Sequence, residues 1–224
     1  MAQSIKQKNI KRFNGDKKVS LSILGHHERR LIEFLIPKIP KKLESYHLTL
    51  LTLLWSALVI LFSFFSRKNL DWLWGVSLMI VFQYFSDSLD GALGKYRKMG
   101  LAKWGHYMDH FLDYVFICSV LIGYSFITPR NFDFYLFCIL AIFGGYMVNS
   151  YLSFSITNQF RITYFKVGPT EIRILLIIIN TLLIIFGKTY LGGALPFVLI
   201  ASLAGLIVVV WRTQRKIWQM REKE

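Results

Sequence analysis

Two stretches, Asp87-Ser-Leu-Asp90-Gly91-Ala-Leu-Gly94-Lys95 and Gly105-His-Tyr-Met-Asp109-His-Phe-Leu-Asp113, decide the fold of this 224-residue chain. They place four aspartates in or beside two adjacent apolar runs, joined by a short basic segment. On a helix, residues three and four positions apart share one face. Each stretch therefore forms one stripe of aspartates and glycines, and we expect the two stripes to face each other near one membrane surface.

Four carboxylates at close quarters repel one another, and an Asp at the centre of a membrane helix costs roughly 2.5–3.5 kcal/mol on insertion scales. Protonation relieves this repulsion, and so do cations placed between the carboxylates. Hard divalent ions such as Mg²⁺ prefer oxygen ligands, and a pair of them can clamp a diphosphate. The pattern therefore indicates a metal site formed by Asp87, Asp90, Asp109 and Asp113.

The glycines of the two stripes have two possible uses. Because Gly91, Gly94 and Gly105 lack a Cβ, a flat base or a phosphate can approach the backbone closely there. Small residues also allow membrane helices to pack closely against each other. The residues by themselves leave both uses open.

Composition indicates that lipid is the solvent for most of the chain. Apolar residues make up 54% of it and charged residues only 18%, whereas an average soluble domain is about 25% charged. The apolar residues gather into segments long enough to cross a bilayer core, which needs about 20 helical residues. Six such segments are predicted: 48–65, 72–91, 105–127, 134–156, 172–186 and 193–211. We expect an all-α integral membrane protein.

The net charge of +14 follows the predicted topology. All but four of the 27 lysines and arginines fall in residues 1–47, in the second gap between segments, in the fourth gap or at its border (Arg173), and after residue 211. The four exceptions are Arg67, Lys68, Arg130 and Lys188. Six crossings with both termini in the cytoplasm satisfy the positive-inside rule. Because orientation and anionic lipid explain the charge, we expect no nucleic-acid partner.

Three regions are expected along the chain. Residues 1–47 form a basic cytoplasmic segment, 48–211 the six-helix transmembrane domain, and 212–224 a basic cytoplasmic tail. The first twenty residues are polar and basic, without the apolar region of a signal peptide. The chain is therefore expected to enter the membrane through its first crossing.

Residues 26–45 predict an amphipathic helix on the membrane surface. Three apolar residues share one face at helical spacing: Leu31, Phe34 and Leu35. Basic residues flank this face, as in interfacial helices. Pro37 and Pro40 predict that the helix bends or ends there. The alternative is a solvated basic segment that only helps to orient the chain.

The aspartate stretches resemble the signature of the CDP-alcohol phosphotransferase family. In that signature two Asp and a Gly precede Ala-Arg, and Gly, Asp and Asp follow at four-residue spacing. Six residues match it position by position: Asp87, Asp90, Gly91, Gly105, Asp109 and Asp113. The family's six-helix architecture extends the resemblance over most of the chain. Gly94-Lys95 stands where the family has Ala-Arg, and the gap before Gly105 is one residue longer than usual.

The resemblance implies a reaction of phospholipid biosynthesis, in which a CDP-linked donor and an alcohol give a substituted phospho-alcohol and CMP. It implies two divalent ions, Mg²⁺ or Mn²⁺, held by the first three aspartates. Asp113 would approach the metal site and also take the proton of the acceptor hydroxyl. The resemblance further implies a homodimer with its active site on the cytoplasmic side of the bilayer.

The same resemblance assigns donor contacts to the glycines. Gly91 and Gly105 would border the cytidine pocket, and Gly94 and Lys95 stand where phosphate contacts are expected. Lys95 keeps the charge of the family's arginine but lacks its planar fork. Arg97, two residues further on, is a candidate replacement.

The acceptor side is marked by Gly168-Pro169-Thr170-Glu171, ahead of the fifth segment. Thr170 or Glu171 would cap that helix. The run also resembles the branch of the family that moves phosphocholine or phosphoethanolamine onto diacylglycerol. The branch that joins CDP-diacylglycerol to a small polar alcohol remains open. His106 and His110, beside the second stripe, are candidates either for binding phosphate or acceptor or for a structural role.

Two other classes of protein are alternatives to an enzyme. A secondary transporter or cation channel also carries acidic residues in membrane helices. It predicts broken helices at the midplane and two related halves, and the sequence shows neither. A non-catalytic scaffold would not need all four aspartates. The sequence therefore favours a membrane enzyme.

Overall fold

The computed structural model describes residues 25–157 and 168–220, and these residues form helices and no strand. In chain order the elements are α1 (Gly25–Leu35), η1 (Ile36–Lys38), α2 (Ser45–Phe65), η2 (Leu70–Trp72), α3 (Leu73–Tyr96), α4 (Ala102–Ser125), η3 (Arg130–Phe132), α5 (Asp133–Thr157), α6 (Pro169–Phe186) and α7 (Leu191–Met220). Parts of the predicted basic regions lie outside the described residues, namely 1–24, 221–224 and the segment 158–167 with Lys166. The all-α prediction is confirmed.

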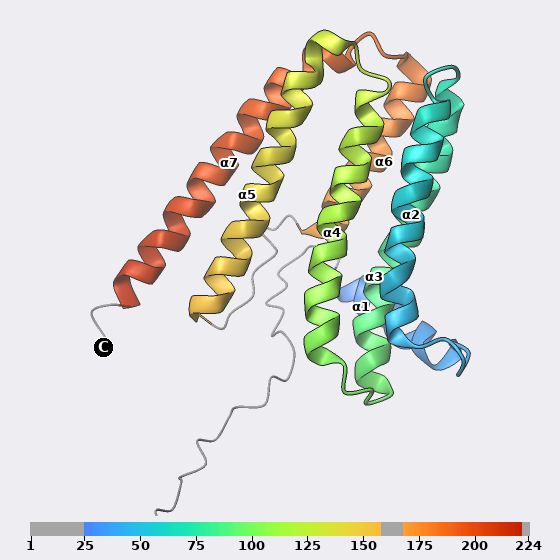
Figure 1. Cartoon of the computed structure of the whole chain (residues 1–224), viewed down its shortest axis with the longest axis vertical. Helices are drawn as coiled ribbons and strands as arrows, with labels where there is room; N and C mark the ends of the chain where they lie inside the picture. Colours follow the sequence, from blue (N-terminus) through green and yellow to red (C-terminus); the bar gives the residue numbers. More distant parts are fainter. Residues whose placement is uncertain (1–24, 158–167, 221–224) are drawn as a thin grey trace, which may run out of the picture.

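The long helices α2–α7 run along a common direction and alternate in sense (Figure 1). Helix α2 packs against α3 and α4, α6 packs against α3, and α5 packs against α7. Helix α1 lies at the end of the bundle where α3 turns into α4 (Figure 1). The aspartate stretches of α3 and α4 are thus close to this same end.

The surface of the bundle is suited to lipid. Among the described residues, four helical segments are long and apolar enough to cross a membrane: α2, Arg130–Thr157, α6 and α7. Large apolar side chains point outward, such as Phe134, Phe137 and Phe197, which are 69%, 68% and 74% exposed. Helices α3 and α4 have similar length, but they carry the four aspartates, which lowers their apolar content. The prediction of an integral membrane protein is confirmed, and four of the six predicted crossings correspond to these segments.

Buried polar contacts hold three of the helices in register. The hydroxyl of Tyr124 on α4 donates to Asn180 Oδ1 on α6 at 2.9 Å. Asn180 Nδ2 in turn donates to Ser77 Oγ on α3 at 3.0 Å. All three residues are buried. Such hydrogen bonds between helices stabilise membrane bundles, where a lipid tail offers a polar group no partner.

The predicted helix over residues 26–45 is shorter in the structure. Helix α1 ends at Leu35, and Pro37 lies in the 3₁₀ turn η1 that follows. The prediction that the helix bends or ends at the prolines is therefore confirmed. The physical reason is that proline has no backbone N–H with which to continue a helix. The extension to residue 45 was wrong, because Ser45 already begins α2.

Arg97, the candidate replacement for the family's arginine, has another role in the structure. Its guanidinium donates to the backbone carbonyl of Ile39 at 2.8 Å and to that of Leu43 at 2.5 Å. It also reaches the carbonyls of Pro40 and Lys41. Arg97 thus anchors the connection between η1 and α2 to the end of α3.

The first turn of α6 is capped by Glu171. Gly168 is the N-cap residue and Pro169 takes the first helical position, where its missing N–H has no consequence. The carboxylate of Glu171 accepts a hydrogen bond from the backbone N–H of Gly168 at 2.8 Å. Of the two predicted capping residues, Glu171 therefore has that role, while Thr170 donates its hydroxyl to Glu28 of α1 at 3.4 Å.

Candidate active site

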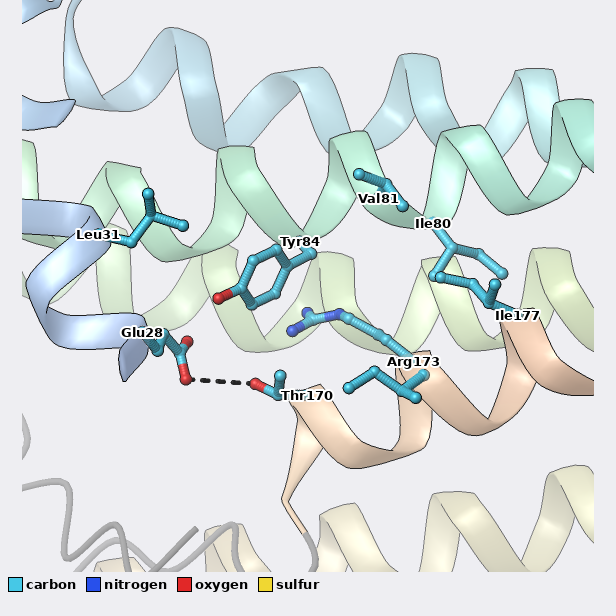
Figure 2. Close-up of a pocket in the computed structure, with 9 residues that line it drawn as sticks. Glu28, Leu31, Ile80, Val81, Tyr84, Thr170, Arg173 and Ile177 are labelled. Atoms are coloured by element: carbon cyan, nitrogen blue, oxygen red, sulfur yellow. Dashed lines mark hydrogen bonds between the residues drawn. The ribbon is translucent and has the colours of Figure 1, made fainter. Parts of the chain in front are cut away.

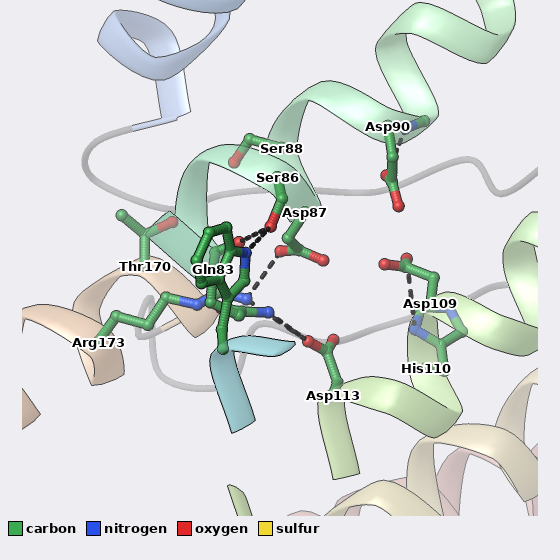
Figure 3. Close-up of polar contacts among 12 residues, drawn as sticks. Gln83, Ser86, Asp87, Ser88, Asp90, Asp109, His110, Asp113, Thr170 and Arg173 are labelled. Atoms are coloured by element: carbon green, nitrogen blue, oxygen red, sulfur yellow. Dashed lines mark hydrogen bonds and ion pairs between the residues drawn. The ribbon is translucent and has the colours of Figure 1, made fainter. Parts of the chain in front are cut away.

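The hairpin of α3 and α4 brings three of the four aspartates together. Carboxylate oxygens of Asp87, Asp109 and Asp113 all lie within 4.8 Å of one another, and each residue is half-buried (Figure 3). Asp87 comes from α3, and Asp109 and Asp113 come from successive turns of α4. The stripes expected from helical spacing therefore do face each other.

Asp90 lies beside this cluster and is held from α2. Its Oδ2 accepts a hydrogen bond from the hydroxyl of Thr49 at 2.6 Å. Its Oδ1 accepts one from the backbone N–H of Gly91. Asp90 is buried, with 5% exposure, and lies across from Asp109 (Figure 3). Helix α2 thus fixes the orientation of the fourth carboxylate.

A buried arginine from α6 contacts the cluster. Arg173 Nη2 donates to Asp87 Oδ2 at 2.7 Å and lies 3.5 Å from Asp113 Oδ1 (Figure 3). The side chain has only 11% exposure, so its charge is compensated by the two carboxylates rather than by water. Arg173 offsets part of the negative charge of the three clustered aspartates.

Gln83 adds a neutral contact to the cluster. Its side-chain amide donates to Asp113 Oδ1 at 3.3 Å, and the residue is fully buried. Sequence reasoning missed both Gln83 and Arg173 as site residues. The available signals were a glutamine four positions before Asp87 on the same stripe and an arginine one turn inside an apolar helix.

The site therefore has two levels along the helix axes. Asp87 and Asp113, with Arg173 and Gln83, form the level farther from the α3–α4 turn. Asp90 and Asp109 form the level nearer to that turn, because they come later on α3 and earlier on α4. Each level has its own neutral or cationic partners.

The three clustered carboxylates fit a divalent metal ion. They provide only oxygen donors, the type that Mg²⁺ and Mn²⁺ prefer. A single guanidinium does not balance three carboxylates, so the cluster retains net negative charge. The residues that would hold the ion are Asp87, Asp109 and Asp113.

The glycines of the two stripes differ in surroundings. A Cβ added at Gly91 or Gly105 would meet no described heavy atom within 4 Å beyond its local backbone. A Cβ at Gly94 would lie 3.2 Å from Ser45 Oγ, so Gly94 permits close packing of α3 on α2. Lys95 is exposed at the end of α3. Gly91 and Gly105 therefore border open space, and Gly94 packs against α2.

The two histidines lie between α4 and α5. His110 Nδ1 is 3.8 Å from Asp109 Oδ2, and the hydroxyl of Tyr151 donates to the carbonyl of His110 at 3.1 Å. The ring of His106 contacts that of His110, with centroids 4.6 Å apart, and that of Phe154 at 5.1 Å. His110 thus lies next to Asp109 and packs against α5.

In a comparison with known families, the matched region spans this whole site. The model of the family described as CDP-alcohol phosphatidyltransferase matches residues 46–211. This range runs from α2 into α7 and includes all four aspartates, Gln83 and Arg173. No curated protein matches the chain in a direct sequence comparison.

Proposed function

The chain belongs to the CDP-alcohol phosphatidyltransferase family, and from this membership we propose that it transfers a substituted phosphate group from a CDP-linked donor to an alcohol and releases CMP. Membership makes the protein a membrane-embedded phosphotransferase of phospholipid synthesis. The observation that supports the proposed reaction best is the cluster of Asp87, Asp109 and Asp113 inside the matched region. The match gives no support to a transporter.

The metal requirement follows from the charge of the substrate. We propose two ions, Mg²⁺ or Mn²⁺, with Asp90 as a further ligand beside the three clustered aspartates. Bound divalent ions would neutralise the diphosphate of the donor and the charge that develops on CMP. The carboxylates that would hold the ions are themselves fixed in orientation, because Thr49 contacts Asp90 and Arg173 contacts Asp87.

Asp113 is the proposed general base. The alcohol has a high pKa, so a carboxylate within hydrogen-bond reach must accept its proton as it attacks. The hydroxyl oxygen forms a bond to the phosphorus that carries the transferred group, and the bond from that phosphorus to the CMP oxygen breaks. The amide of Gln83 and the guanidinium of Arg173 hold Asp113 in place for this step.

The proposed setting in the membrane follows from the distribution of charge. We propose that α2–α7 all cross the bilayer, that residues 48–211 form the catalytic domain, and that both termini and the site face the cytoplasm. Helix α1 would lie on the membrane surface, which its exposed Leu31 and Phe34 support. A homodimer is part of the same proposal.

The first test is CMP release by the purified protein in liposomes. CDP-diacylglycerol, CDP-ethanolamine and CDP-choline are each combined with small alcohols and with diacylglycerol, with Mg²⁺ or Mn²⁺. We expect metal-dependent CMP release that falls to background in Asp87→Ala, because this change removes a ligand of the cluster. Asp133→Ala, an exposed aspartate at the start of α5, should retain full activity. Absence of release with every pair, together with absence of donor binding, would overturn the proposal.

A second test uses the open glycines. Gly91→Ala and Gly105→Ala should leave thermal stability unchanged or higher, since alanine is favoured over glycine in helices by about 1 kcal/mol and the added Cβ meets open space. The KM for the CDP donor should rise about tenfold, because a methyl group in a close-fitting site is worth this much. Gly193→Ala on α7, equally open, is the matched control. An unchanged donor KM in both variants would exclude these glycines from the donor pocket.

A further inference from the structure

Arg173 carries more hydrogen-bond donors than its neighbours use. A guanidinium has five N–H donors and no acceptor. Both carboxylate contacts of Arg173, to Asp87 and to Asp113, are made by the same nitrogen, Nη2. The N–H groups on Nε and Nη1 have no hydrogen-bond partner among the residues that the structure describes. Because the residue is only 9% exposed, leaving these donors unpaired costs free energy, and a bound ligand would relieve this cost.

The guanidinium borders a cavity of about 310 Å³ between α1, α3 and α6 (Figure 2). Figure 2 shows the Arg173 side chain reaching from α6 towards Tyr84 of α3, whose ring centroid is 6.0 Å from the guanidinium carbon. Glu28, the acid that lines the cavity, accepts hydrogen bonds from Ser88 at 3.3 Å and from Thr170 at 3.4 Å. Most of the wall is aliphatic, so a charge interaction there is stronger than in water. The arrangement around Arg173 therefore suits an anionic group.

The basic residues at the end of α3 lie elsewhere. Lys95 is exposed there, one residue beyond Gly94. The guanidinium of Arg97 is engaged with backbone carbonyls of the connection between η1 and α2. Arg173, in contrast, lies within ion-pair distance of two carboxylates of the cluster and still has unused donors. A guanidinium contact to substrate phosphate is therefore available from α6.

The two levels of the site indicate which phosphate Arg173 would meet. The proposed donor pocket at Gly91 and Gly105 is near the α3–α4 turn, so the phosphorus bonded to cytidine falls at the nearer level. The transferred phosphorus then falls at the farther level, beside Asp87 and Asp113. The proposed base, Asp113, must reach the hydroxyl that attacks this phosphorus. Arg173 belongs to the same level, because it contacts both of these aspartates.

We propose that Arg173 is a catalytic residue that donates a free N–H of its guanidinium to one non-bridging oxygen of the transferred phosphate. This inference rests on the proposed function. The acceptor oxygen bonds to the phosphorus, its proton passes to Asp113, and the P–O bond to CMP breaks with its electron pair on CMP. The guanidinium keeps all its protons and stabilises the charge on the non-bridging oxygen.

The test replaces a non-bridging oxygen of the transferred phosphorus with sulfur. The two diastereomers of this donor place the sulfur either towards Arg173 or towards the metal. Sulfur is a weak hydrogen-bond acceptor and a poor ligand for Mg²⁺. In the unaltered protein with Mg²⁺, each diastereomer should release CMP about tenfold more slowly than the oxygen donor. Cd²⁺, which binds sulfur well, should restore only the diastereomer whose sulfur is directed towards the metal.

Arg173→Met should release CMP from the oxygen donor about a hundredfold more slowly, as expected for the loss of one preorganised donor. The sulfur effect that Cd²⁺ does not restore should disappear in this variant, whereas the one that Cd²⁺ restores should remain. Each sulfur effect is a ratio of rates within one variant, so it does not depend on how much protein is folded. Arg173→Lys, which keeps a cation, should show an intermediate effect. Arg130→Met, on η3, should match the unaltered protein.

The outcomes separate this inference from the proposed reaction. An unchanged sulfur effect in Arg173→Met would show that Arg173 only positions the aspartates, and it would overturn the catalytic role while leaving the reaction intact. Restoration of both diastereomers by Cd²⁺ in the unaltered protein would also overturn it, because metal would then contact both oxygens. Absence of CMP release from every oxygen donor would overturn the proposed function, and this inference with it.

Discussion

Asp113→Asn is expected to lower kcat by about a hundred- to ten-thousandfold, the range of rate enhancement that a positioned general base provides. Asparagine has nearly the same shape, but it cannot accept the proton of the attacking hydroxyl. Its side-chain oxygen can still accept the hydrogen bond that Gln83 donates to Asp113 in the structure. The effect should therefore fall on the chemical step rather than on the fold.

Donor binding distinguishes this role from that of a metal ligand alone. Because Asp87 and Asp109 remain, Asp113→Asn should bind the CDP donor with an affinity close to that of the unaltered protein. Asp87→Asn should lose donor binding together with activity. Single-turnover CMP release and calorimetric binding of the donor in Mg²⁺ measure the two effects, with Asp133→Asn as the matched control. Ordinary turnover in Asp113→Asn would remove the residue from its role as base.

The part of the site that the sequence predicts is local. Helical spacing alone places Asp87 and Asp90 on one face of α3 and Asp109 and Asp113 on one face of α4. A short connection forces the two helices into an antiparallel pair, so their acidic faces meet. The end of α1 can also be predicted from the sequence, because Pro37 disrupts the helix through its own backbone and needs no distant partner.

The missed part of the site depends on long-range packing. Arg173 is 60 positions from Asp113 along the chain, and only the packing of α6 on α3 brings the two together. In the sequence it is counted as one basic residue beside a membrane segment, which the positive-inside rule explains sufficiently. Gln83 is hidden in the same way inside an apolar run. The cavity behind them needs three helices in place and has no linear signature.

Arg173→Met is expected to destabilise the metal-free protein strongly. Removing one partner of a buried ion pair costs about 3–5 kcal/mol, because the other charge is left uncompensated. Here the remaining charges are Asp87 and Asp113, with Asp109 within 4.8 Å of both. Methionine has a helix propensity similar to that of arginine, so the helix itself should not suffer. In EDTA the melting temperature should fall by about 6–20 °C.

Divalent metal should reverse most of this loss. An ion bound to the carboxylates replaces the missing positive charge, and a ligand that binds the folded state stabilises it by mass action. Without the nearby guanidinium the carboxylates should also bind the ion more tightly, because a like charge no longer opposes it. The rise in melting temperature on adding Mg²⁺ should therefore be larger in Arg173→Met than in the unaltered protein. Arg130→Met, at an exposed arginine of η3, should behave like the unaltered protein in both conditions.

A conservative variant separates charge from geometry. Arg173→Lys keeps the positive charge but cannot span Asp87 and Asp113 with a planar fork. Its stability in EDTA should lie between those of the unaltered protein and Arg173→Met. Equal melting temperatures of all three proteins in EDTA, with equal responses to Mg²⁺, would show that Arg173 does not compensate the aspartates. A stepwise fall in melting temperature from the unaltered protein to Arg173→Lys to Arg173→Met, abolished by Mg²⁺, would instead identify Arg173 as the cation that compensates the carboxylates in the absence of metal.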